Sequence, residues 1–335
     1  MILRNFITGV VTALLLLAAT PALSVQTEYS ADQLVSLMAV AMRSTNYRGT
    51  LTYEHGGTLE TLQVTHWVDE GREFEHYLHL SGPEQQLSRS GGSLGCKTLG
   101  SHLLRGGALQ SPDGAILHLS EHYQFYTRGY ARIAGRKAIV IQLLPKDDAR
   151  LGITLAVDTE SALLVKAVVS SSSRVLERLQ FVSLDIDPQL DEDERKSLVI
   201  AAGKVAPTCG SPEPESRIPW AASWIPSGFV RASAQWTDAD GFVETYTDGV
   251  NSFSVFIKPA GAGEELKPNR IAHRGATLIA LTTQQIAGEL LHITLVGELP
   301  QNTAQQVLVS VRPLATTTTP AANESEIDVE SENVN

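Results

Sequence analysis

The chain has 335 residues, 43% of them hydrophobic, and a formal net charge of −11 at pH 7. A chain of this length can bury two modest hydrophobic cores. Its acidic balance excludes nucleic acid as an expected partner, because nucleic-acid binding rewards a basic surface.

Residues 1–24 have the organisation of a secretory signal peptide. One charged residue, Arg4, precedes an apolar run over 10–19, and Ala22-Leu23-Ser24 supplies the small residues that a signal peptidase requires. The alternative is an uncleaved membrane anchor, but the run is shorter than the ~20 residues that span a bilayer. We therefore expect an exported chain.

The two cysteines are Cys96 and Cys209. Export places them in an oxidising compartment, where an even number of cysteines favours a disulfide over two isolated thiols. The bond would tie the first domain to the linker before the second, and closing so long a loop would contribute ~4 kcal/mol to stability. We predict that these two cysteines form a disulfide.

Residues 25–187 predict a first domain built mostly of strands. Ser30 and Gln33 form a capping box, which marks the start of a helix. An apolar stripe at helical spacing follows and is expected to face the core: Leu34, Leu37, Met38 and Ala41. From Tyr47 onward the apolar residues alternate with a period of two, which predicts an antiparallel meander. The strands of this meander are expected at 48–55, 58–68 and 72–80, with a fourth strand at 84–90. Further strands are expected at 123–127, 131–144, 151–158, 163–170 and 175–186, with 95–120 left unassigned.

The run Ala-Ile-Val-Ile at 138–141 is apolar on both faces of its predicted strand. Such a strand must be covered on both sides, so the sheet should curl around the first helix, the unassigned loop or a ligand. If a ligand fills the curl, we expect an acyl cavity; otherwise the same side chains are ordinary core. The candidate lining residues, which do not all share a face, are Tyr53, Trp67, Phe74, Tyr77, Ile139 and Ile141.

Residues 188–217 predict a linker with a short helix, whose acidic start at 191–194 suits the helix dipole. Residues 218–315 predict a smaller α+β domain, and the acidic segment 316–335, poor in apolar residues, predicts a disordered tail. Strands of the second domain are expected at 231–236, 242–247, 250–257, 276–282 and 290–296. A final amphipathic helix is expected to carry Ala304, Val307, Leu308 and Val311.

Asp248-Gly249 separates two of these strands and predicts a tight two-residue hairpin turn, because both residue types tolerate positive φ. Phe253, Val255 and Ile257 alternate along the strand after the turn. They share one face, which we expect to be core.

No residue pattern identifies a catalytic site. The sequence has no Gly-x-Ser-x-Gly elbow, no phosphate-binding Gly-rich loop and no recognisable pair of catalytic carboxylates. His118 and His122 have the spacing of metal ligands on a helix, but no third ligand can be placed. We therefore expect a binding protein without catalytic residues, cofactor or metal. The basic cluster Arg270, His273 and Arg274 is either a solvated loop or a contact for an anionic partner.

Six segments carry a family resemblance. They are Leu80-Ser-Gly-Pro83, Gly129-Tyr-Ala-Arg-Ile-Ala-Gly-Arg136, Asp158-Thr-Glu-Ser161, Trp224-Ile-Pro-Ser-Gly-Phe229, 246–259 and 296–304. Together, and in this order, they resemble the RseB/MucB family of periplasmic regulators of the sigma-E (envelope stress) response. No single segment is a chemical signature, so the resemblance rests on their combination.

The resemblance implies a fold that is mostly β with α+β: an N-terminal half-open β-barrel like that of the lipoprotein carriers LolA and LolB, and a smaller C-terminal α+β domain. It implies a periplasmic protein that binds the periplasmic domain of an RseA/MucA-like anti-sigma factor and shields it from the site-1 protease. Lipopolysaccharide or another lipidated ligand would release the shield. The alternative is a lipid or lipoprotein carrier of the LolA type, which would need only the barrel. The oligomeric state stays open, a homo-oligomer included.

Overall fold

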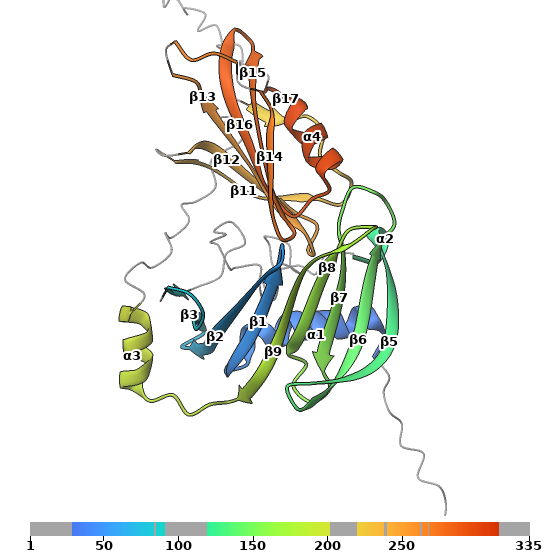
Figure 1. Ribbon diagram of the computed structural model, residues 1–335, viewed down its shortest axis with the longest axis vertical. Helices are drawn as coiled ribbons and strands as arrows, with labels where there is room; N and C mark the ends of the chain where they lie inside the picture. The colour runs from blue at the N-terminus through green and yellow to red at the C-terminus, as the bar shows by residue number, and fades with distance from the viewer. Residues whose placement is uncertain are drawn as a thin grey trace, which may run out of the picture.

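The computed structural model describes residues 29–83, 85–90, 119–201, 220–237, 240–261, 263–266 and 268–314. In Figure 1 these residues form two domains, one above the other. The lower domain holds a nine-stranded sheet, and the upper holds a six-stranded sheet and a two-stranded one. The fold is mostly β, and neither large sheet closes on itself.

Helix α1 (Ala31–Ser44) begins where expected. The Ser30 backbone N–H donates to Gln33 Oε1 at 2.9 Å, as the capping box predicts. Met38 is fully buried, but Leu37 is 39% exposed, so its predicted core position is wrong. Two apolar stripes, one residue apart along the chain, both fit the helical period. The helix packs through the second stripe rather than through the predicted one. Its buried residues are Val35, Met38, Ala39, Ala41 and Met42.

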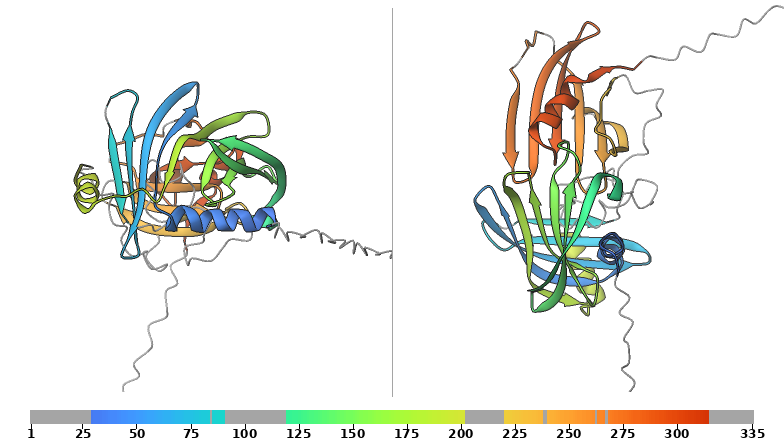
Figure 2. Two further views of the ribbon diagram at one scale, coloured as in Figure 1. Left: turned by 90° about the horizontal axis from the view of Figure 1, so that it is seen from below. Right: turned by 90° about the vertical axis from the view of Figure 1, so that its right-hand side faces the viewer.

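The first sheet is antiparallel, in the order β4-β3-β2-β1-β9-β8-β7-β6-β5. The meander of its first strands was predicted, whereas the pairing of β1 with β9, which joins them to the meander β5–β9, was not. Its strands are β1 (Tyr47–His55), β2 (Thr58–Asp69), β3 (Arg72–His79), β4 (Gln86–Ser90), β5 (Tyr123–Ile133), β6 (Arg136–Pro145), β7 (Gly152–Asp158), β8 (Leu164–Ser170) and β9 (Val175–Ile186). A one-turn helix, α2 (Leu119–His122), precedes β5. The sheet curls, and α1 lies across its concave side (Figure 2, left). Buried residues of α1 and of strands throughout the sheet form one core.

The single strand expected at 131–144 is wrong, because a hairpin turn divides it. Ala134 and Gly135 both have positive φ, 49° and 76°, and Ile133 pairs with Arg136 across them. This is the backbone of a tight two-residue turn. Ala134 is apolar, so the hydrophobic pattern continues through the turn and hides it.

The strand that is apolar on both faces is covered on both. Ile141 belongs to the core beneath α1, whereas Ala138 belongs to a small cluster on the opposite face; both are 0% exposed. The inner cover of this strand is therefore the protein's own core.

Helix α3 (Glu192–Ala201) is the short helix expected in the linker, and it packs on the first domain. Arg48 and Ser88 lie in one cross-strand row on the face of the sheet that points away from α1. Arg48 pairs with Glu194, and Ser88 Oγ donates to the Leu198 carbonyl at 2.8 Å. Helix α3 therefore packs against the outer face of β1–β4.

The second domain is a six-stranded sheet in the order β11-β12-β13-β16-β15-β14 with a helix on one face. Its elements are β10 (Trp220–Ala222), β11 (Val230–Thr237), β12 (Gly241–Thr247), β13 (Ser252–Pro259), β14 (Arg270–Arg274), β15 (Thr277–Ile286), β16 (Glu289–Gly297), α4 (Gln301–Val309) and β17 (Val311–Pro313). Strands β10 and β17 pair with each other. The predicted core face is confirmed, because Phe253, Val255 and Ile257 are at most 1% exposed. Strand β14 and the pair β10–β17 were not expected.

The two-residue turn expected at Asp248-Gly249 is wrong. Thr247 pairs with Ser252, so the loop between β12 and β13 has four residues, 248–251. The Thr247 hydroxyl donates to the Asn251 carbonyl at 3.0 Å and accepts the Gly249 N–H, which closes the loop from within. Asp248 is 2% exposed. Asp248, which the sequence predicts to lie in a surface turn, is therefore buried, and its partners lie in the other domain.

Candidate functional site at the domain junction

The second domain meets the first through its turn at 227–228 and through two further chain reversals, which we call the tips: loop 248–251 and turn 275–276. Both reach one end of the nine-stranded sheet, where β1 ends and where β5, β7 and β9 begin (Figure 1). We call the contact between the tips and this end the junction.

Asp248 is the centre of the junction. Its side chain and that of Arg150 are both 0% exposed, and Arg150 Nη1 donates to Asp248 Oδ2 at 2.9 Å. The Tyr123 hydroxyl donates to the same oxygen at 2.7 Å. Asp248 Oδ1 accepts the backbone N–H groups of Val250 and Asn251 at 2.9 and 2.7 Å. One carboxylate thus orders its own loop and binds the other domain.

Two further side chains extend this network. Asn251 Nδ2 donates to the Tyr123 hydroxyl at 2.7 Å. Arg150 Nη2 donates to the Ser227 carbonyl, and its guanidinium carbon lies 5.4 Å from the centre of the Phe229 ring. Arg150 therefore contacts two family-like segments of the second domain, 224–229 and 246–259.

The second tip makes a separate polar contact. The Ala276 N–H donates to Glu177 Oε2 at 3.1 Å, and the Tyr53 hydroxyl donates to the same oxygen at 2.9 Å. Beside it, Arg274 Nη2 donates to Glu60 Oε1 at 3.1 Å. The junction is therefore held at two places on the sheet end.

Two glycines let the surfaces approach closely. Gly275 has φ +63°, and a Cβ there would lie 2.8 Å from Glu177 Oε2 and 3.0 Å from His55 Cβ. Gly228 has φ +83°, and a Cβ there would lie 2.1 Å from His122 Nε2. Both the backbone conformation and the lack of space favour glycine.

The tips also carry apolar side chains into the first domain. Val250 and Ala276 are 3% and 2% exposed, and both belong to the same core cluster as Met38 of α1 and Ile141 of β6. The main core of the first domain is thus completed by residues of the second.

Burial dominates the electrostatics of the junction. It raises the pKa of Asp248 above 3.8, although the Asn251 N–H, the Tyr123 hydroxyl and the Arg150 charge act against it. Burial, reinforced by Asp248, raises the pKa of Tyr123 well above 10.0. Burial, reinforced by Glu177, also raises the pKa of Tyr53. Both tyrosines therefore keep their protons and act as hydrogen-bond donors.

Two other family-like segments, 129–136 and 158–161, contact each other at the opposite end of the sheet. Arg136 donates from Nε and Nη2 to the two carboxylate oxygens of Asp158, both at 2.9 Å, and the Ser161 hydroxyl donates to Asp158 Oδ2 at 2.7 Å. Burial raises the pKa of Asp158, but these hydrogen bonds outweigh it and hold the pKa below 3.8. The pair fastens the β5–β6 turn to the β7–β8 turn.

This pair predicts a pH-dependent contribution to stability. A lowered pKa in the folded state stabilises the protein above pH 3.8, and that contribution is lost as the pH falls through the folded-state pKa. We expect Arg136→Gln to lower the free energy of unfolding by ~2 kcal/mol at pH 7 and by less at pH 3, measured by urea unfolding. Arg128→Gln, which removes an exposed arginine, is the control. An equal loss at both pH values would contradict this assignment.

The predicted acyl-lining residues do not come together as one set. Tyr77 and Ile141 are buried in the core beneath α1, and Tyr53 and Ile139 pack against it. Trp67 and Phe74 instead stack on each other, with ring centres 5.2 Å apart, on the opposite face of β2 and β3. The curled face therefore presents four of the six candidates, and α1 and the core cover them.

The basic cluster of the second domain is also divided. It forms β14, which is an edge strand. Arg270 and Arg274 point to one face of this strand, and His273 points to the other. Arg274 is engaged with Glu60 across the junction. Arg270 and His273 are exposed.

Several predicted residues lie outside the described residues: Cys96, Cys209 and His118. The disulfide therefore stays a prediction. In the part of the chain that the structure describes, no three His, Cys, Asp or Glu side chains are placed to hold a metal ion. No helix among the described residues has the length and apolarity to cross a membrane.

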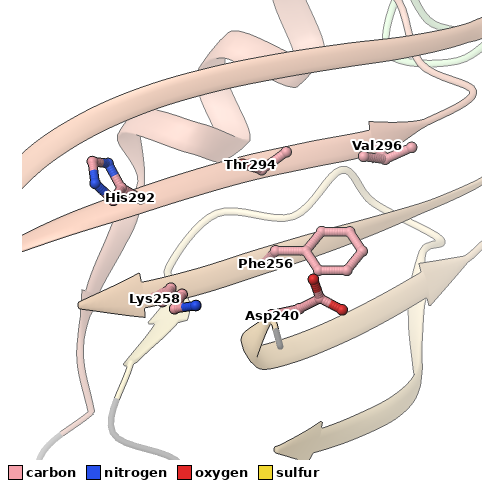
Figure 3. Close-up of a pocket in the computed structure, with 6 residues that line it drawn as sticks. All are labelled: Asp240, Phe256, Lys258, His292, Thr294 and Val296. Atoms are coloured by element: carbon pink, nitrogen blue, oxygen red, sulfur yellow. The ribbon is translucent and has the colours of Figure 1, made fainter. Parts of the chain in front are cut away.

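A groove of about 320 Å³ lies on the open face of the second sheet, away from α4 (Figure 3). Phe256 and Val296 lie at one end of its lining, with Asp240 beside Phe256, and Lys258 and His292 lie at the other. His292 is engaged by Glu264 and Thr283. The groove shares no residue with the network around Asp248.

Comparisons with known proteins match both domains. The MucB/RseB N-terminal domain matches residues 30–199, and the MucB/RseB C-terminal domain matches 214–312. The sigma factor AlgU regulatory protein MucB of Pseudomonas aeruginosa is 29% identical over an alignment of 321 residues, which covers 90% of this chain and 97% of that protein. The sigma-E factor regulatory protein RseB of Escherichia coli K12 is 23% identical over an alignment of 294 residues, which covers 83% of this chain and 89% of that protein.

Solved structures agree with these matches. A crystal structure of MucB in complex with MucA(peri) superposes with a TM-score of 0.66 at 28% identity, covering 85% of this chain and all of that one. A structure of the P. aeruginosa MucA/MucB complex gives 0.65 at 26% identity, covering 85% and 99%. Both domains, in one order and over nearly the full length of the relatives, are those of one family of sigma-factor regulators. The chain therefore belongs to the MucB/RseB family.

Proposed function

We propose that this protein binds the periplasmic region of a membrane anti-sigma factor and shields it from site-1 proteolysis, so that the sigma factor stays sequestered. The observation that carries the proposal is the match, over the whole of the relative's chain, to MucB in complex with MucA(peri). The family is one of regulatory binding proteins rather than enzymes. The partner is an RseA/MucA-like protein.

The junction supports a role for both domains in this binding. A buried ion pair links the two domains, and Val250 and Ala276 of the second complete the core of the first, so both domains are held together when a partner binds. A carrier of the LolA type would need the barrel alone. The insertion of the tips into the barrel core therefore favours the regulator over the carrier.

The ligand that releases the anti-sigma factor is proposed to be lipopolysaccharide or another lipidated molecule. Its acyl part would occupy the inner face of the curled sheet, near Tyr77, Ile139 and Ile141, since each buried CH₂ is worth ~0.8 kcal/mol. A ligand can release a partner only if it binds better to the partner-free conformation. Linked sites typically weaken each other by roughly 5- to 150-fold.

The proposed location is the periplasm, reached through the signal peptide 1–24 and consistent with a disulfide between Cys96 and Cys209. The family match supports this location, because the relatives regulate the AlgU and sigma-E factors and the solved partner is MucA(peri).

The test is capture of the partner. The mature chain, immobilised, is exposed to solubilised inner membrane of its own organism, with an unrelated periplasmic protein as the control bait. We expect specific recovery of a single-span anti-sigma protein. Recovery of lipoproteins without such a protein would favour the carrier and contradict the proposal.

A further inference from the structure

The tips of the second domain close one end of the first-domain core. Val250 and Ala276 enter that core beside α1, and the hydrogen bonds of the tips go to residues at or just before the starts of β5, β7 and β9. Because the nine strands are antiparallel, these residues all lie at one end of the curl. Among the described residues, the inner face is thus covered along its length by α1 and at this end by the tips.

An apolar ligand that reaches the inner face from the side of α1 or from the junction end displaces one of these two covers. Helix α1 buries five side chains over its length, including Met38 and Met42. The tips bury two small ones, Val250 and Ala276, and otherwise make polar contacts that water can replace when the domains part. Withdrawal of the tips therefore exposes less apolar surface than withdrawal of the helix.

We propose that the second domain is a removable cap on the first, and that an acyl chain enters the inner core when the tips withdraw from the junction. The proposal rests on the lipidated ligand of the proposed function and adds its route. The closed cap is then the form that holds the anti-sigma factor, and the acyl chain selects the open form. Withdrawal of the tips would therefore both admit the acyl chain and weaken the binding of the anti-sigma factor, so that each opposes the binding of the other.

The geometry of Gly275 supplies a covalent test. A Cβ on Gly275 would lie 3.0 Å from His55 Cβ, near the 3.5–4.5 Å that a disulfide requires. The other close neighbours, the ends of the Glu177 and Tyr53 side chains, can rotate away. The variant His55→Cys/Gly275→Cys would therefore lock the cap when oxidised and release it when reduced.

The measurement is the affinity of the mature full-length chain for a fluorescent fatty acid, 11-(dansylamino)undecanoic acid. Wild type and His55→Cys are taken through the same oxidation and reduction, which controls for Cys96, Cys209 and the lost imidazole. We expect oxidation of the double variant to weaken the probe's binding by roughly 5- to 150-fold, the usual range for linked sites, and reduction to restore it. Neither control should change.

A second pair of variants tests the cap in the opposite direction. Gly275→Ala strains the junction, whereas Gly288→Ala places the same side chain at φ +89° with nothing within 4 Å. We expect the first to bind the probe more tightly than wild type and the second to match wild type.

The outcomes separate the two proposals. Equal probe affinity for the oxidised and reduced double variant would overturn the cap and leave lipid binding intact, with entry beside α1 instead. Absence of probe binding to wild type and to every variant would overturn the lipidated ligand and the cap together.

Discussion

Replacing Asp248 by alanine is expected to destabilise the protein by ~3 kcal/mol, because it leaves the guanidinium of Arg150 buried without its carboxylate partner. The expected loss is at the low end for a broken buried pair, since Arg150 keeps its contacts with Asp147 and the Ser227 carbonyl. Tyr123 also loses an acceptor. Urea unfolding, monitored by tryptophan fluorescence, measures the change in the free energy of unfolding.

Asp147→Ala is the matched control, because Asp147 pairs with the same arginine but is 40% exposed. Water can replace part of the interaction of this exposed carboxylate, so the variant should lose clearly less stability than Asp248→Ala. The double variant Arg150→Met/Asp248→Leu removes both charges and should recover most of the stability that Asp248→Ala loses. Similar values for Asp248→Ala and Asp147→Ala would show that the buried pair does not hold the junction.

Replacing Phe253 by alanine is expected to destabilise the protein by ~3–5 kcal/mol, the range for removing a buried phenylalanine. Phe253 is 1% exposed and lies between Phe229 and Tyr246, with ring centres 5.3 and 5.2 Å away. Because Phe229 also contacts Arg150, the cavity would loosen the junction as well as the second core. Urea unfolding and the near-ultraviolet circular dichroism of the aromatic residues report the two effects.

Phe256→Ala is the control on the same strand. Phe256 is half-buried on the opposite, open face, so its removal should destabilise the protein by clearly less than that of Phe253. Equal losses for the two variants would mean that the face alternation does not decide which side of the sheet is core.

Local patterns predicted most elements of the fold. The capping box at Ser30, the alternation of β1 to β9 and the core face of β13 depend on neighbours in sequence, and the structure has them. The errors arise where tertiary packing, rather than the local sequence, determines the structure. Leu37 belongs to one of two equivalent helical stripes, and Ala134 makes a turn without a polar signal.

The site was hidden for the same reason. Asp248 has the sequence context of a surface turn, and its partner Arg150 stands 98 positions earlier in a polar loop. No local pattern pairs them. One signal of these contacts was available, because the segments that resemble the family lie at them. Segments 224–229 and 246–259 both contact Arg150, and segment 129–136 contacts segment 158–161. Trp67 and Phe74, two of the predicted lining residues, lie one residue out of phase with the inner face and so on the opposite face from the other four.

The most direct measurement is a calorimetric titration of the periplasmic segment of the anti-sigma factor into the mature chain. The account predicts saturable binding to wild type and to Gly288→Ala, and weaker binding to Gly275→Ala, in which the junction is strained. Absence of binding to the folded wild-type chain would contradict the account.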